Sequence, residues 1–240
     1  MKIVGIVPAR GGSKGIPKKN LKKIAGKPLI QYTFESALKS KINKIVVSTD
    51  DKKIEKFSKS QGIDTTIIRP KSLATDSAKT FDVVKHTINY LKQNENYEPD
   101  IVIILQPTSP LRTSMMIDDS IDLLKHNNSS SVISVSKIKT HQSSSFYYKN
   151  KFLIPFRKDF IKFDRRQQYV PLYFPTGAIY TSWFKTITKF NSLYGPRIIP
   201  LITEQELSID VDTIFDMFVA EMTILNWNKY LKRFNFSLNQ

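Results

Sequence analysis

The chain has 240 residues, 40% of them hydrophobic, and a formal net charge of +16; it can bury a sizeable core, which excludes a wholly disordered protein. It contains no cysteine and three scattered histidines, which excludes disulfides and thiolate chemistry and leaves a zinc site with little support. No run approaches the roughly 20 apolar residues of a membrane span, and Pro8 interrupts the first apolar run, so we expect a soluble, cytoplasmic protein without a membrane partner.

Apolar runs of strand length alternate with segments of helical period, as is typical of helices packed around a parallel sheet. The pattern predicts strands at 2–8, 44–50, 64–70, 100–107 and 130–136, and helices at 28–40, 52–62, 79–93 and 114–127. From residue 140 to 175 the helical period is lost, and two aromatic-rich stretches around turn residues predict a hairpin. The pattern resumes with a strand at 176–182 and a long amphipathic helix at 213–234. We expect one α/β domain, 1–240, with 140–175 inserted as an interface or lid.

The first predicted strand leads into the loop PARGGSKGIPKKN, residues 8–20. Ligands of open α/β sheets bind at the carboxyl ends of the strands, where this loop lies. Glycines 11, 12 and 15 would let backbone amides approach an anion, and Arg10 and Lys14 add positive charge. The loop therefore predicts a polyphosphate site, with a tight turn bordered by solvated lysines as the alternative. The spacing of its glycines fits neither the Walker phosphate loop, GxxxxGK[ST], nor the dinucleotide-binding fingerprint, GxGxxG.

Polar motifs also follow three later strands, namely STDD, RPKSLATDSA and LQPTSPLR. Taken singly, Arg69 and Arg112 would be read as members of surface ion pairs. Their joint placement at one edge of the sheet favours a binding site there.

The late segment ELSIDVDTIFD places Asp210 and Asp212 on one side of an extended chain, because alternate residues face the same way. Two carboxylates on one face suit Mg²⁺, which also keeps waters and binds substrate phosphates. The alternative is that Asp212 only caps the following helix. Together, the loop and the carboxylate pair predict metal-assisted transfer at a nucleotide phosphate.

The motifs PARGGSKGIPKKNL, LATDSA, LQPTSPLR, RRQQ…P…TGAIY and SIDVDT occur in an order and spacing that resembles the CMP-sialic acid synthetases, or acylneuraminate cytidylyltransferases, over residues 2–225. The resemblance implies a three-layer, Rossmann-like nucleotidyltransferase fold with a mostly parallel sheet. It implies an enzyme that uses CTP and Mg²⁺ to activate a 2-keto-3-deoxy sugar acid, a sialic acid or related nonulosonate, for cell-surface polysaccharide biosynthesis. It also makes 140–175 a dimerisation arm and the protein a homodimer.

The resemblance assigns roles residue by residue. It implies Arg10, Lys14 and Asp212 as catalytic residues and Asp210 with Asp212 as the Mg²⁺ ligands. The nucleotide would be bound by Ala9, Arg10, Gly11, Gly12, Ser13, Lys14, Asn20, Arg69, Asp76 and Ser77. The sugar acid would be bound by Gln106, Thr108, Ser109, Arg112, Arg165, Arg166 and Gly177.

Two departures from the family pattern concern the sugar. Serines follow His141 where relatives often carry a cation, and Phe174 stands where many have arginine, so the sugar carboxylate is left to Arg165, Arg166 or Lys158. Two alternatives stay open: transfer to another sugar or from another nucleotide, such as an octulosonate, or GTP with an amino-sugar; and a polyanion-binding protein that uses the charge of +16. The lysines are spread along the whole chain and no nucleic-acid-binding motif occurs, so we expect no nucleic-acid partner.

Overall fold

The computed structural model describes residues 1–63, 65–139, 145–156 and 170–234. A seven-stranded sheet forms its centre, in the order β11-β7-β10-β6-β1-β4-β5. The bounds of these strands are β1 Ile3–Pro8, β4 Lys44–Thr49, β5 Thr65–Ile68, β6 Ile101–Ile104, β7 Ser131–Lys137, β10 Tyr173–Trp183 and β11 Ile198–Ile202.

Most neighbouring strands are parallel, which confirms the expected sheet. The exception is β10, which runs antiparallel to both β6 and β7. Its register with β7 shifts between Pro175 and Tyr180, and Gly177 within this irregular stretch has φ +78°, a conformation that favours glycine. The bend turns this part of β10 toward the loop that follows β6.

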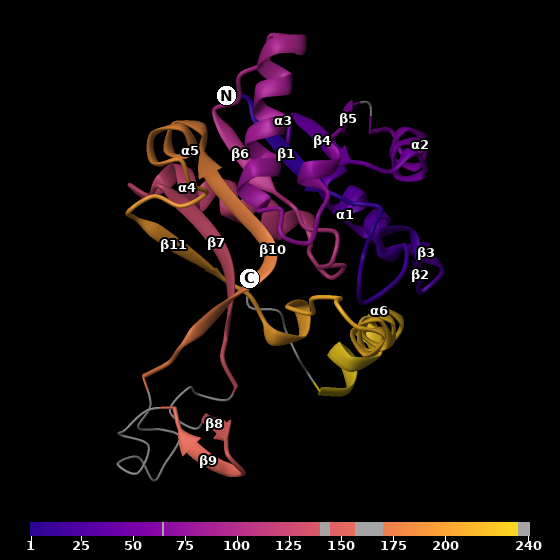
Figure 1. The fold of residues 1–240 in the computed structure, drawn as a ribbon, viewed down its shortest axis with the longest axis vertical. Helices are drawn as coiled ribbons and strands as arrows, with labels where there is room; N and C mark the ends of the chain where they lie inside the picture. The colour runs from indigo at the N-terminus through magenta and orange to yellow at the C-terminus, as the bar shows by residue number, and fades with distance from the viewer. Residues whose placement is uncertain (64, 140–144, 157–169, 235–240) are drawn as a thin grey trace.

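Both faces of the sheet are covered, because successive side chains of the central strands point to opposite sides. Ile3 and Val7 of β1 belong to one core, while Val4 and Ile6 belong to the other. The first core is covered by α1 Leu29–Leu38, α2 Lys52–Ser60 and α4 Ser114–His126. The second is covered by α3 Thr80–Glu95 and α5 Phe184–Phe190. The result is the predicted three-layer fold (Figure 1).

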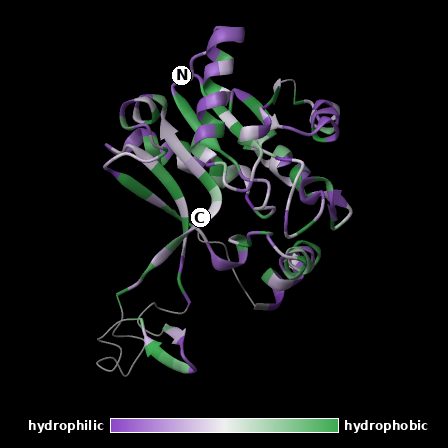
Figure 2. Cartoon of the chain, viewed as in Figure 1, coloured by the Kyte–Doolittle hydropathy of each residue, from purple (hydrophilic) through white to green (hydrophobic). Residues whose placement is uncertain are grey.

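A hairpin stands away from this body. β8, Phe146–Lys149, pairs with β9, Phe152–Pro155, at the end of the extended β7 and β10 segments (Figure 1). All eight strand residues are exposed, although β9 is coloured as strongly apolar as the strands of the body (Figure 2). A two-stranded hairpin with so much exposed apolar surface gains little stability alone.

The last helix, α6 Ile214–Phe234, lies beside the loop that follows β1. A small buried cluster joins them: Ile16 of the loop packs with Val211 and Met217. The segment that carries the two predicted metal ligands is therefore held against the predicted phosphate loop by apolar packing.

Several elements were not predicted. These are α5, β11, a short hairpin of β2 Lys23–Ile24 with β3 Lys27–Pro28, and the 3₁₀ turns η1 Lys19–Leu21, η2 Lys71–Leu73 and η6 Gln205–Leu207. None of the helices in the described ranges has both the length and the apolar composition that a bilayer span requires.

Candidate active site

A cavity of about 280 Å³ opens at the carboxyl ends of β1, β5 and β6. Its walls come from the loop after β1, the segment after β5 and the loop after β6. The predicted residues that line it are Arg10, Gly12, Ser13, Asn20, Arg69, Asp76, Gln106 and Thr108. Three motifs that are far apart in the sequence thus meet at one site, as expected at the carboxyl ends of the strands of an open α/β sheet.

The start of the loop is held by the end of β4. Ala9 is fully buried and its amide donates to the carbonyl of Ser48 over 2.9 Å. The Gly11 amide donates to Asp50 Oδ1 over 2.9 Å, so it is committed to the protein and not free for an anion. Any side chain on Gly11 would meet the Asp51 carboxylate at 2.7 Å. Asp50 and Asp51 belong to the STDD motif, which the sequence placed at the binding edge of the sheet. In the structure these two residues fix the course of the loop.

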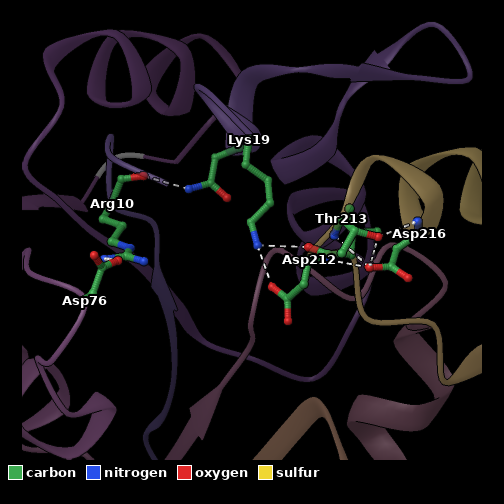
Figure 3. Close-up of polar contacts among 8 residues, drawn as sticks. Arg10, Lys19, Asp76, Asp212, Thr213 and Asp216 are labelled. Carbon is green, nitrogen blue, oxygen red and sulfur yellow. Dashed lines mark hydrogen bonds and ion pairs between the residues drawn. The ribbon is translucent and has the colours of Figure 1, made fainter. Parts of the chain in front are cut away.

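Arg10 and Lys14, two cations of the loop, share the Asp76 carboxylate, and Figure 3 shows the pair of Arg10 with Asp76. Arg10 Nη1 lies 2.6 Å from Asp76 Oδ1, and Lys14 Nζ lies 3.0 Å from Asp76 Oδ2. Asn20 donates from Nδ2 to the Arg10 carbonyl over 2.9 Å and fixes the Arg10 backbone. Hydrogen bonds from Lys14 and Arg10 lower the pKa of Asp76 below its ordinary value, so this carboxylate stays charged near neutral pH. Ser77 beside it is exposed, 3.2 Å from the Thr75 hydroxyl.

Arg69 is a buried cation in the cavity wall, with 6% of its surface exposed. Its backbone is tied to β4, since its amide donates to the Thr49 carbonyl over 2.8 Å. Burial lowers the pKa of Arg69, the charge of Asp50 opposes this, and the charge of Arg10 adds to it. Its Nε has no hydrogen-bond partner among the described residues. A guanidinium so placed is suited to an acceptor that enters the cavity.

The far wall is formed by the loop after β6. Gln106 and Thr108 line the cavity, and a side chain at Gly177 would lie 3.3 Å from Gln106 Oε1 and 3.7 Å from Asp210 Oδ2. Gly177 therefore lets β10 approach both polar side chains closely. The predicted sugar side and the predicted metal side are adjacent.

Ser109 and Arg112 lie deeper than their predicted sugar-binding role requires. Ser109 is 1% and Arg112 is 3% exposed. The Arg112 guanidinium donates through Nη1 to the carbonyls of Gln106, over 3.0 Å, and Ala178, over 2.8 Å. Burial lowers the pKa of Arg112 to about 9. Arg112 thus joins the Gln106 loop to β10 and supports the cavity wall from behind.

The segment 210–212 is docked on both loops. The Val211 amide donates to the Thr108 carbonyl over 2.8 Å, and Lys19 Nζ donates to the Val211 carbonyl over 2.9 Å. Burial raises the pKa of Asp210, the Thr108 hydroxyl opposes the rise, and the negative charge of Asp212 adds to it. A cation beside Asp210 would favour its ionised form.

Asp212 does not cap α6, so the alternative that this residue serves only as a helix cap is wrong. The Thr213 hydroxyl accepts from the Asp216 amide over 3.2 Å, and Asp216 Oδ2 accepts from the Thr213 amide over 2.7 Å (Figure 3). This reciprocal pair is a capping box. The Asp212 carboxylate instead meets Lys19 Nζ at 2.8 Å, and 70% of its side chain is exposed. It is available to a ligand.

The donor set fits Mg²⁺ only if the substrate completes it. Among the described residues, no group of three or more histidine, cysteine, aspartate or glutamate side chains could hold a metal ion. Asp210 and Asp212 offer two hard oxygen donors, and Mg²⁺ commonly takes one or two carboxylates together with waters and phosphate oxygens.

Sequence reasoning missed Lys19, Thr213 and Asp216. The T-x-x-D spacing of Thr213 and Asp216 resembles a capping-box pattern and could have revealed the helix start. Nothing in the sequence indicated the partner of Lys19, because its contacts lie 192 and 193 residues away. Arg165 and Arg166, together with His141 and Lys158, lie outside the described residues.

Comparison with known proteins gives a consistent result. The model of the family described as Cytidylyltransferase matches residues 4–217. The chain is 33% identical over 219 residues to the N-acylneuraminate cytidylyltransferase of Streptococcus agalactiae serotype III, covering 89% of this chain and 51% of that protein. It is 34% identical to the CMP-N,N'-diacetyllegionaminic acid synthase of Legionella pneumophila and 31% identical to the pseudaminic acid cytidylyltransferase of Campylobacter jejuni, covering 95% and 96% of those proteins and 92% of this chain in both cases.

The chain thus spans about half the length of the streptococcal relative and nearly the whole of the other two. Among solved structures, it is similar to a CMP:2-keto-3-deoxy-manno-octonic acid synthetase complexed with CTP. The TM-score is 0.69 at 18% identity, over 95% of this chain and all of that one. At this identity the likeness shows the fold, and it confirms the three-layer α/β architecture.

Proposed function

Because the chain belongs to the cytidylyltransferase family, we propose that it transfers CMP from CTP to a 2-keto-3-deoxy sugar acid of the nonulosonate class and releases pyrophosphate. One observation carries the proposal. Arg10 and Lys19 of the loop after β1 line the cavity, and Lys19 also contacts the Val211 carbonyl and the Asp212 carboxylate, so the segment 210–212 lies next to the cavity. CTP is an intracellular nucleotide, so we place the reaction in the cytoplasm.

The reaction needs little covalent chemistry from the protein. The anomeric hydroxyl oxygen of the sugar attacks the α-phosphorus, the bond from that phosphorus to the bridging oxygen breaks, and pyrophosphate leaves with the electron pair. The hydroxyl proton passes to solvent. Arg10 and Lys14 neutralise phosphate charge, and Arg69 gives hydrogen bonds to an acceptor in the cavity. Fixed cations of this kind act on the transition state without having to reorganise.

We propose that Asp210 and Asp212 hold Mg²⁺ together with phosphate oxygens of the nucleotide. When bound, the ion supplies further charge neutralisation at the phosphates. Lys19 Nζ lies 2.8 Å from the Asp212 carboxylate and orients it. Because Thr213 and Asp216 form the cap of α6, the Asp212 carboxylate is not needed for the cap.

Pyrophosphate release tests the function directly. The protein would be assayed with Mg²⁺ and CTP, GTP, UTP or ATP, each crossed with N-acetylneuraminate, legionaminate, pseudaminate and an octulosonate. We expect release with CTP and one nonulosonate. Release only with the octulosonate or only with another nucleotide would correct the substrate. No release, together with salt-dependent binding to any duplex, would favour a polyanion-binding protein.

Asp212→Asn separates the metal role from the helix cap. We expect the Mg²⁺ concentration for half-maximal activity to rise about tenfold, because one anionic ligand is lost, while the unfolding midpoint stays near that of the parent. The matched control is Asp216→Asn, which should lower stability by about 1 kcal/mol through loss of the cap and leave the Mg²⁺ requirement in place. An ordinary Mg²⁺ titration for Asp212→Asn would contradict the metal assignment.

We further propose that the protein is a homodimer that uses the β8–β9 hairpin. The hairpin projects from the body, and Phe152 and Leu153 are 72% and 66% exposed. A second exposed apolar surface lies on α6, where Phe215 and Phe218 are 70% and 55% exposed. Contiguous exposed apolar residues of this size mark interaction surfaces.

Replacing Phe152 and Leu153 together by serine should convert the dimer into a monomer, because both remove apolar area from the proposed interface. Light scattering behind a sizing column measures the mass. The control Leu38→Ser changes a leucine that is 52% exposed on α1 of the body and should leave the dimer intact. A monomeric parent protein, or a dimer that survives both hairpin substitutions, would overturn the assignment.

A further inference from the structure

The Asp76 carboxylate occupies the place between the two cations that the proposed function assigns to phosphate. Each of its oxygens meets one cation, Oδ1 at 2.6 Å from Arg10 and Oδ2 at 3.0 Å from Lys14. Asp76 also lines the cavity itself. The geometry of a carboxylate bridging two cations through separate oxygens resembles that of two oxygens of one phosphate group.

The two ion pairs of Asp76 are short, but the side chains that form them are accessible to solvent. The side chains of Arg10 and Asp76 are 32% and 41% exposed, and that of Lys14 is 83% exposed. Asp76 lies in the segment between η2 and α3, where Thr75, Ser77 and Ala78 complete a turn with one hydroxyl contact of 3.2 Å and one backbone hydrogen bond. Few contacts thus oppose a movement of Asp76 away from the loop cations.

We propose that Asp76 is an internal counter-ion that holds Arg10 and Lys14 in the free protein and sets the charge a ligand must carry to enter. The inference rests on the proposed function, because it takes the two cations as the phosphate site. A carboxylate and a phosphate cannot share both cations without strong like-charge repulsion. The ligand must therefore displace Asp76 or bind less tightly beside it.

A counter-ion at this position makes the site selective. Inorganic phosphate carries about two negative charges near neutral pH and gains little over the carboxylate that it would replace. A triphosphate carries more charge and spans further along the loop, so it can still displace Asp76. Asp76 thus lowers the affinity for every anion but lowers it most for the small ones.

Asp76→Asn tests the idea, because asparagine keeps the shape of the side chain and removes its charge. Exposed ion pairs are individually weak, so losing two of them should tighten CTP binding about three- to tenfold by titration calorimetry, measured without sugar. Inorganic triphosphate is the second probe, and its affinity should rise by a similar factor. The inhibition constant of inorganic phosphate, measured by its competition with CTP binding, should fall by a larger factor than the Kd of CTP.

Two further variants serve as controls. Asp82→Asn removes the same charge from an exposed residue in the first turn of α3 that does not line the cavity, and it should change neither affinity by more than about twofold. Asp76→Glu keeps the charge on a longer side chain and should bind both probes more weakly than Asp76→Asn. The unfolding midpoint of each variant verifies that it is folded.

The outcomes separate the alternatives. Weaker CTP binding in Asp76→Asn would show that Asp76 positions Arg10 for the nucleotide, and it would overturn the inference. A change no larger than that of Asp82→Asn would also overturn it. If the parent protein bound no CTP but Asp76→Asn still gained affinity for inorganic triphosphate, the counter-ion would stand and the proposed function would fail.

Discussion

Arg10→Ala is expected to lower kcat/KM for CTP by about 10²-fold or more, because a fixed charge on the transferring group is lost. The structure explains why the change should act on chemistry and leave the fold intact. The Arg10 carbonyl, which accepts from Asn20, is retained in the variant. The guanidinium lines the cavity and has Asp76 as its ion-pair partner, so its removal leaves no buried carboxylate without a partner.

Matched variants make the result specific to this position. Lys23→Ala removes the same charge from an exposed residue of β2 away from the cavity and should retain most of the activity. Arg10→Lys keeps the charge but loses the two-pronged donor, and it should fall between the parent and Arg10→Ala. Steady-state kinetics with varied CTP would measure all three. Equal kcat/KM for Arg10→Ala and Lys23→Ala would remove Arg10 from the phosphate site.

The sequence predicted the parallel part of the fold because its information is local. Buried parallel strands are continuous apolar runs, and the helices between them have a period that shows in the sequence. The direction of β10 is not local information. Its apolar run predicts a strand, but only packing places it antiparallel between β6 and β7. β11 was missed because Pro200 interrupts a short strand at the edge of the sheet.

The candidate site was predicted where a residue type alone indicates its chemistry. Glycines and cations in a loop predict an anion site, and two alternating aspartates predict a hard cation. The sequence could not show that Arg112 is buried and donates to two carbonyls, since the residue type alone does not tell whether an arginine lies on the surface or in the core. Nor could it show that the Gly11 amide is occupied by Asp50. Both facts depend on contacts between residues distant in sequence.

The glycines of the loop also differ in ways that the sequence does not show. Gly12 could carry a side chain in open space, with nothing within 4 Å of it. Gly15 could not, because a Cβ there would collide with the carbonyl oxygen of Asp212. The colliding atom belongs to the backbone, so rotation of a side chain cannot relieve the contact. Gly15 is therefore one of the points at which the loop after β1 and the segment 210–212 touch.

Gly15→Ala should lower kcat/KM by about 10²-fold, because a displacement on the order of 1 Å between catalytic groups has that effect. The loop and the segment 210–212 must separate to admit the methyl group, which moves Asp212 relative to Arg10. The Mg²⁺ requirement should rise in the same variant, since the two carboxylates lose their registration with the phosphates. This joint effect distinguishes a displaced segment from a weakened nucleotide site.

Gly12→Ala adds the same methyl group to the same loop, so it controls for the lost flexibility of a glycine. Its loss of activity should be several-fold smaller than that of Gly15→Ala, and its Mg²⁺ titration should follow the parent. A larger loss of activity in Gly12→Ala than in Gly15→Ala would mean that the loop needs glycine for close approach of the ligand at Gly12, and not for its contact with the segment 210–212 at Gly15. Equal losses with unaltered Mg²⁺ titrations would mean that the loop and the segment 210–212 act independently, and the site would no longer be a single unit joined through Lys19.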